Sequence, residues 1–357
     1  MNRMYSFLLA AGLCNALSAQ TPSVIEAAEY DPSQNRWFIS NSSSILETFD
    51  GGDSYAYFGN GSATHGMEVV DGHLFAIGSN VVRAYDLTTA ELVGSLPISG
   101  AGFLNGMGSR NGELVISDFS TGKLHRVDIS DPANMSSEVL VNATGTTPNG
   151  VVIDEANNRA IVVNWGGNAP ILDVDLETGE FSIVLNTGLG NLDGVDMDGA
   201  GQFYVSSWSP ARITRYSNDF ATAETVVQGA GSGLSNPADI SYAIETDTLG
   251  VANSGNGTPS FHSFGTVNSI DVAAVTEEFA RWSAQGLNLS SPVAGSWVIQ
   301  AYTFNGQLVD SQRLELPAAP TLVPLERLNW DANVFGILQI VSPRGQRFSV
   351  RPDQRQR

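Results

Sequence analysis

The sequence has 357 residues, of which 42% are hydrophobic and 15% are charged, with 37 glycines and a formal net charge of −20 at pH 7. This composition excludes a wholly disordered chain and argues against nucleic acid or an anionic membrane surface as a partner. Few charges and many glycines favour short strands and tight turns over long surface helices. The acid excess lies in residues 21–276, whereas residues 277–357 are close to neutral, which indicates two domains with different roles.

Residues 1–19 are typical of a secretory signal peptide. Arg3 precedes an apolar run, Phe7 to Leu13, and small residues lead to the expected cleavage site near Ala19. The only cysteine, Cys14, lies in this segment; a lipoprotein anchor there is the weaker alternative, because Leu13 is bulkier than lipobox processing accepts. No later run reaches the roughly 18 apolar residues of a transmembrane helix. The sequence therefore predicts export through the periplasm, with the protein secreted or held at the cell surface.

Residues 20–276 repeat one order of four short strands, six times. The second strand of each repeat is the clearest, and the six begin at Trp37, Leu74, Leu114, Ala160, Phe203 and Leu249. Repeats of about 40 residues with four strands and no helical periodicity are typical of a β-propeller. We therefore predict an all-β fold whose larger part is a six-bladed β-propeller.

The first strand of each repeat opens on a polar residue. These residues are Glu26, His65, Asn105, Asn149, Asp193 and, in the sixth repeat, Asp239. Innermost strands line the channel of a propeller, so one side chain per blade should converge on the axis. Carboxylate and amide oxygens favour Ca²⁺, with Mg²⁺ or Mn²⁺ possible, whereas zinc is disfavoured because only one histidine is present in the set.

The polar residues that open the first strands have an alternative interpretation, as parts of tight turns. Asn-Gly and Asp-Gly, which occur at Asn105, Asn149 and Asp193, are also common tight-turn dipeptides that are selected for positive φ. Their recurrence in register across six repeats favours a site over a series of turns.

The pattern resembles the gluconolactonase/senescence-marker-protein/luciferin-regenerating-enzyme superfamily of six-bladed propellers, which includes the paraoxonases, over about residues 23–275. The resemblance implies that Glu26, Asn149 and Asp193 hold a catalytic Ca²⁺ or another divalent ion. A paraoxonase-like segment from residue 236 to 257 adds Asp239 as a further ligand, and His65 resembles a histidine proposed as a general base.

The expected substrate site departs from the gluconolactonase pattern. Phe103 and Leu104 stand where that branch usually has an Arg and an Asn that contact a sugar lactone, so a less polar ester or lactone fits better. Asn105, Trp165 and Trp208 are expected to contact the substrate, although packing between blades accounts equally well for the two tryptophans.

The C-terminal part is expected to be a linker over residues 277–286, with a short helical turn, and a small β-sandwich over residues 287–357. The stretches 297–309 and 335–340 resemble two strands of type IX secretion sorting domains, with Ala301 and Leu338 in place of the usual residues, and Asn305-Gly306 predicts a hairpin between two strands. The resemblance implies the secretion machinery as a partner. An immunoglobulin-like accessory domain is the alternative.

Together these features predict an exported, divalent-metal-dependent hydrolase of a lactone or ester, in which Asp193 or His65 activates water. The competing class is a non-catalytic propeller that binds a glycan, peptide or surface partner and uses the ion only for stability. Propellers carry out both kinds of function, so the fold alone does not decide between them.

Overall fold

The computed structural model describes residues 20–110, 112–229 and 231–264 and, further along the chain, 280–283, 286–290, 294–302, 308–317, 320–324, 337–341 and 347–350. The signal peptide predicted for residues 1–19 lies outside these ranges. Apart from one 3₁₀ turn, η1 (Glu155–Asn157), the regular structure of the described residues is all strand. The chain divides into two compact units, residues 1–264 and 265–357.

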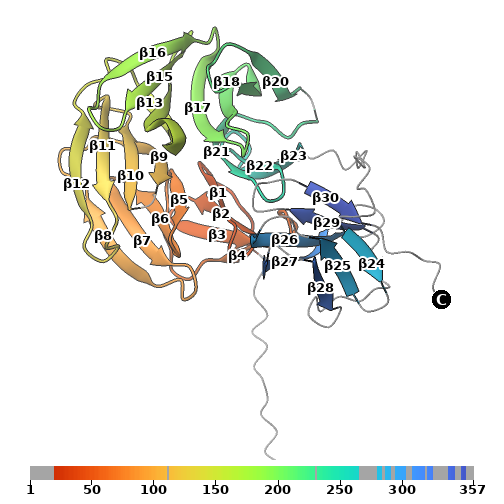
Figure 1. The fold of residues 1–357 in the computed structure, drawn as a ribbon. Coiled ribbons are helices and arrows are strands. Elements are labelled where there is room, and N and C mark those ends of the chain that lie inside the picture. Colours follow the sequence, from red (N-terminus) through yellow and green to blue (C-terminus); the bar gives the residue numbers. More distant parts are fainter. Residues whose placement is uncertain are drawn as a thin grey trace, which may run out of the picture. The chain divides into compact units, whose positions relative to one another are not determined.

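The first unit is a six-bladed β-propeller, which confirms the fold predicted from the repeat (Figure 1). Blades 1 and 2 contain β1 (Ala28–Asp31), β2 (Arg36–Asn41), β3 (Ser44–Thr48) and β4 (Ala56–Tyr57), then β5 (Met67–Val70), β6 (His73–Gly78), β7 (Val81–Asp86) and β8 (Leu92–Pro97). Blades 3 and 4 contain β9 (Leu104–Arg110), β10 (Glu113–Asp118), β11 (Lys123–Asp128) and β12 (Ser136–Val141), then β13 (Pro148–Asp154), β14 (Arg159–Asn164), β15 (Pro170–Asp175) and β16 (Phe181–Asn186). Blades 5 and 6 contain β17 (Gly190–Met197), β18 (Phe203–Ser209), β19 (Ala211–Tyr216) and β20 (Ala223–Gln228), then β21 (Pro237–Ala243), β22 (Thr248–Asn253) and β23 (Thr258–Ser263).

The first strand of every blade lies innermost. These six strands contact one another in a closed ring that runs from β1 through β5, β9, β13 and β17 to β21 and back to β1 (Figure 1). The second strands are buried on both faces, as in β6 from Leu74 to Gly78, because each is covered by the two neighbouring blades. The core therefore lies between adjacent blades, and one apolar cluster joins Phe75 and Ile77 of blade 2 to Leu114 and Ile116 of blade 3.

The Asn-Gly and Asp-Gly pairs lie inside the first strands and not in turns. The tight-turn interpretation is therefore wrong for these pairs. Glycine is required at these positions for a different physical reason. A Cβ added to Gly106 would lie 2.2 Å from the carbonyl oxygen of Asn149, and one added to Gly150 would lie 2.4 Å from that of Asp193. Only glycine allows the innermost strands to approach so closely around the axis.

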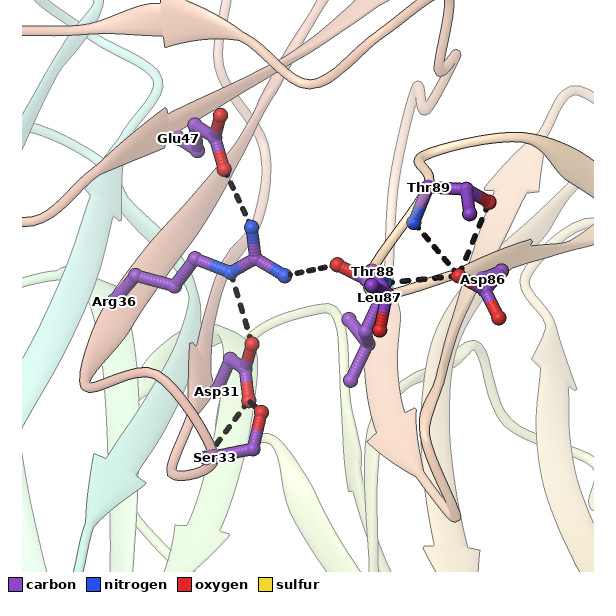
Figure 2. Close-up of polar contacts among 8 residues, drawn as sticks. All are labelled: Asp31, Ser33, Arg36, Glu47, Asp86, Leu87, Thr88 and Thr89. Carbon is purple, nitrogen blue, oxygen red and sulfur yellow. Dashed lines mark hydrogen bonds and ion pairs between the residues drawn. The ribbon is translucent and has the colours of Figure 1, made fainter.

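A buried arginine links two neighbouring blades where β1 ends and β2 begins. Figure 2 shows Arg36 donating from Nε to Asp31 (2.8 Å) and from Nη1 to Glu47 (2.7 Å) within blade 1, and from Nη2 to the carbonyl of Leu87 in blade 2 (2.8 Å). The hairpin that presents Leu87 is itself fixed, because the Asp86 carboxylate accepts the backbone N–H groups of the next two threonines (Figure 2).

The second unit contains two antiparallel sheets. One has the order β24 (Ala280–Ser283), β25 (Gly286–Ser290) and β28 (Pro320–Pro324), and the other has β27 (Leu308–Leu316), β26 (Gly295–Tyr302), β29 (Ile337–Val341) and β30 (Arg347–Val350). Leu287 and Leu289, and likewise Trp297 and Ile299, are buried at alternate positions, so each sheet has an inward apolar face.

Two details of this unit bear on the sequence predictions. Strand β24 occupies residues 280–283 of the expected linker, so the helical turn predicted there is wrong: these residues pair with β25. Asn305-Gly306 and the start of the stretch 335–340 lie outside the described residues, although β26 and β27 pair antiparallel on either side of residues 303–307.

Candidate functional site

Glu26, Asn149 and Asp193 come together at the end of the channel where the first strands begin. They come from blades 1, 4 and 5, and the closed ring of first strands brings them near the axis. Asn149 is 1% exposed and Asp193 is 6% exposed. The backbone holds Asp193 in place, because the following N–H, of Gly194, donates to Ser206 Oγ at 2.7 Å.

Burial dominates the electrostatics of this group. It raises the pKa of Asp193 well above its usual range, and the neighbouring Glu26 carboxylate raises it further. Burial also raises the pKa of Glu26 to about 7. In the described part of the chain no arginine or lysine forms an ion pair with either carboxylate. A buried acid and a partly buried one without a cationic partner are unfavourable as anions unless a cation joins them.

The donor set fits a hard divalent ion through one further observation. The Asn149 amide donates from Nδ2 to the carbonyl of Leu192 (3.3 Å), and its Oδ1 is buried without a hydrogen-bond partner in the described structure. A buried carbonyl oxygen that has no hydrogen-bond partner is a suitable ligand for Ca²⁺. Across the described residues no three His, Cys, Asp or Glu side chains form a group that could hold a metal, so any such site here depends on the Asn149 oxygen.

Asp239 has a different position from the one expected of a fourth ligand. Its N–H donates to the carbonyl of Glu26 (3.0 Å), and its charge raises the pKa of Asp193. Its side chain, however, lines a cavity of about 210 Å³ that is bounded by first strands of five blades, farther along the channel.

This cavity holds acids that the sequence analysis missed. Glu29, Glu68 and Asp196 line it together with Asp239. Burial raises the pKa of Asp196 to about 7 and that of Asp239 to about 8, and it raises the pKa of Glu29 and of Glu68 well above the usual range. The sequence contained a signal for three of these acids. Each lies three positions after a polar residue that opens a first strand: Glu29 after Glu26, Glu68 after His65 and Asp196 after Asp193.

His65 and Asn105 lie in the neighbouring blades, 2 and 3. His65 Nδ1 lies 3.0 Å from Thr64 Oγ1, and burial lowers the pKa of His65 to about 4, so the imidazole is neutral at pH 7. The imidazole ring contacts Phe103 edge-to-face, at 4.7 Å between ring centroids. The side chain of Asn105 is half-buried.

Trp165 and Trp208 contact each other edge-to-face, with ring centroids 4.8 Å apart, and both are partly exposed. Trp208 lies close enough to Asp193 to lower the pKa of that carboxyl in part. The indole N–H of Trp208 nevertheless has no hydrogen-bond acceptor within ordinary geometry among the described residues.

Comparison with solved structures finds propellers at low sequence identity. The chain is similar to a gluconolactonase from Xanthomonas campestris (14% identity, TM-score 0.55, 68% of this chain and 86% of that one) and to a protein of unknown function from Bacteroides thetaiotaomicron (11%, 0.57, 69% and 70%). It is also similar to a chain in the nidogen/laminin complex (14%, 0.51, 63% and 92%). No family model and no curated protein sequence matches the chain.

These likenesses extend to the fold alone, because the identities are all far below 25%. The fold and the site together define a six-bladed propeller with buried, unpaired carboxylates at its axis. In the described part of the chain no helix is long and apolar enough to cross a membrane.

Proposed function

We propose that the protein is a divalent-metal-dependent hydrolase of a lactone or ester, of the gluconolactonase/paraoxonase type, with Ca²⁺ as the preferred ion. The observation that carries the proposal is the convergence of Glu26, Asn149 and Asp193 with no cationic side chain beside them and with the Asn149 Oδ1 lacking a partner. Similarity of fold to a gluconolactonase supports the same reaction class at a coarser level.

In this proposal Glu26, Asn149 and Asp193 hold the ion. A bound divalent cation polarises the substrate carbonyl and stabilises the negative charge that develops on its oxygen.

Asp193 is the preferred general base. Its carboxylate lies in the proposed ligand group, where an attacking water would be positioned, and the loss of its proton becomes favourable once a cation is bound. His65 is the second choice: burial keeps it neutral at pH 7, so it is able to accept a proton, but its low pKa of about 4 makes it a weak base.

Metal analysis of the purified protein with a panel of lactones and aryl esters, before and after chelation, tests the proposal. If Asp193 is both ligand and base, Asp193→Asn removes activity and weakens metal binding together. If His65 is the base, His65→Gln lowers turnover by roughly 10²–10⁴ and leaves metal affinity nearly unchanged. Chelator-sensitive hydrolysis that survives both substitutions contradicts the catalytic assignment.

The second candidate is a binding propeller. It is favoured by the similarity to a chain of the nidogen/laminin complex. A binder hydrolyses no ester or lactone in the panel but retains a glycan, peptide or surface partner in a chelator-sensitive way.

Export and sorting are part of the proposal. Residues 1–19 would direct export and residues 287–357 would act as a type IX sorting domain, and the two-sheet unit at the C-terminus is compatible with that role. Deleting residues 287–357 should leave a folded propeller in the periplasm of the native host. Normal arrival of the truncated protein at the surface or in the medium would rule out sorting by this segment.

A further inference from the structure

Five rings form a continuous row at one end of the channel. His65 contacts Phe103, Phe103 contacts Phe119, Phe119 contacts Trp165, and Trp165 contacts Trp208, with ring centroids 4.7, 5.7, 6.0 and 4.8 Å apart. Each pair is edge-to-face, and every ring is partly exposed. Core aromatics of this protein such as Phe38 and Phe75 are buried, so packing alone does not account for a row in which no ring is fully covered.

The row lies at the same end as the proposed metal ligands. The N–H of Phe119 donates to the carbonyl of Phe103 (2.8 Å), which immediately precedes β9, and the N–H of Trp165 donates to the carbonyl of Thr147 (2.9 Å), which immediately precedes β13. Trp208 lies close to Asp193 in the paired strands β17 and β18, where Leu192 faces Ser207. Blades 2 to 5 thus each contribute at least one ring beside the polar group at the axis.

The chemistry of the row is apolar. Its four Phe and Trp side chains carry no charge, and His65 is edge-on to Phe103. Partly exposed aromatic rings in a line bind apolar groups through large contact areas at small entropic cost.

We propose that this aromatic row, His65–Phe103–Phe119–Trp165–Trp208, binds the apolar part of the substrate, so that the protein acts on a lactone or ester with an alkyl or aryl substituent and not on a sugar lactone. The inference rests on the proposed function, which supplies the lactone or ester group of the substrate. The binding of an apolar carbonyl compound by the aromatic row can, however, be measured without hydrolysis. Asn105, in the same stretch of blade 3, would face the polar end of such a ligand.

The first test is substrate preference, which requires no variant. With the full chain and Ca²⁺ present, kcat/KM should rise from γ-butyrolactone to γ-dodecalactone and should be lowest for glucono-δ-lactone. Highest activity on glucono-δ-lactone would overturn the inference and leave the proposed reaction class intact.

The second test measures binding without turnover. Calorimetric titration with 4-phenyl-2-butanone, a carbonyl compound that is not hydrolysed, should show saturable binding, and dihydroxyacetone should show none. Phe119→Leu and Trp165→Leu should each weaken this binding by about three- to tenfold, which corresponds to one aromatic contact. Phe181→Leu is the matched control, because Phe181 is an exposed phenylalanine on the outer strand β16, and it should leave binding unchanged.

The outcomes separate the two proposals. Binding that is weakened by Phe119→Leu and Trp165→Leu, in a protein that hydrolyses nothing, supports the row and rejects the hydrolase. Hydrolysis of γ-dodecalactone whose KM is unchanged by both substitutions supports the hydrolase and rejects the row. If either variant has a lowered melting temperature, the substrate series in the wild-type protein decides.

Discussion

Two buried aspartates in this protein have opposite surroundings. Asp31, the last residue of β1, is 0% exposed, and its carboxylate accepts hydrogen bonds from Arg36 Nε (2.8 Å) and Ser33 Oγ (2.6 Å) (Figure 2). Asp193, at the axis, is 6% exposed and has another carboxylate, that of Glu26, as its charged neighbour. Burial is nearly the same at both positions, but only beside Asp31 does the chain supply the compensating charge.

The difference indicates which acids serve the fold and which are kept for a ligand. The pattern at Asp31 recurs in blade 4, where Arg159 donates to Asp154 (2.9 Å) and to the carbonyl of Asn218 in blade 5 (2.9 Å). Hydrogen bonds from Asn157 and Arg159 hold the pKa of Asp154 below its usual value, although burial alone would raise it. Acids with such partners stabilise the folded chain as anions, whereas the axial acids do so only when a cation is bound.

The largest effect should follow from breaking the ion pair between Asp31 and Arg36. Arg36→Met leaves the Asp31 carboxylate buried without its cation, so the free energy of unfolding should fall by about 3–5 kcal/mol. Urea unfolding measures this change. Arg215→Met is the matched control, because Arg215 pairs with an exposed glutamate, and its effect should be below about 1 kcal/mol. Equal losses in the two variants would contradict the view that the buried pair is a structural element.

The axial acids should make the metal-free protein less stable as the pH rises. Glu26, Asp196 and Asp239 have pKa values of about 7, 7 and 8 in the folded chain and ordinary values when unfolded, so through them the folded state binds more protons between about pH 4 and 8. Burial lowers the pKa of His65 to about 4, which acts in the opposite sense up to the ordinary histidine pKa of about 6.5. Stability of the chelated protein should therefore fall as pH rises from about 6.5 to 8 and should level off above that range.

Thermal unfolding of the chelated protein at intervals from pH 4 to pH 9 measures this dependence. Addition of Ca²⁺ should flatten the curve on its alkaline side, since a bound cation favours the anionic carboxylates near it. A melting temperature that rises steadily from pH 5 to pH 8 without metal would show that the axial acids are compensated in some other way.

Asp193→Asn should raise the free energy of unfolding of the metal-free protein, by less than Arg36→Met lowers it. At pH 8 without metal this substitution removes a buried carboxyl that lacks a cationic partner, so urea unfolding should show a gain of about 1 kcal/mol. Glu91→Gln, at an exposed position, is the control and should leave stability unchanged. Destabilisation of the metal-free protein by Asp193→Asn would show that the carboxylate makes a favourable contact in the fold.

Much of the propeller was predictable because its signals are local. Each second strand is a short apolar run buried on both faces, and all six lie where the sequence predicts them. The polar openings of the first strands were also visible, because repetition placed them in register. Their glycines were open to misinterpretation as turn residues, since the close approach of Gly106 to Asn149 involves a neighbouring blade.

Features that depend on contacts between distant segments were not predictable. Glu68 has apolar neighbours in β5 and so has the pattern of a residue facing solvent, yet it lines the axial cavity, and only its spacing of three positions from His65 distinguishes it in the sequence. The link from Arg36 to Leu87 joins residues 51 positions apart and has no local signature. Ala280 and Arg281 have good helix propensity, but pairing with β25 makes them a strand.

The most direct test is a calcium titration of four proteins by isothermal calorimetry: the wild type, Asn149→Ala, Asp193→Asn and Asp239→Asn. We predict one saturable site in the wild type and at least tenfold weaker binding in Asn149→Ala and Asp193→Asn, because both remove a ligand. The Asp239→Asn variant shows whether Asp239 is a fourth ligand or acts only through its charge from the neighbouring cavity. Wild-type affinity in both Asn149→Ala and Asp193→Asn, or no binding by the wild type, would contradict the claim that the axial acids are kept for a cation.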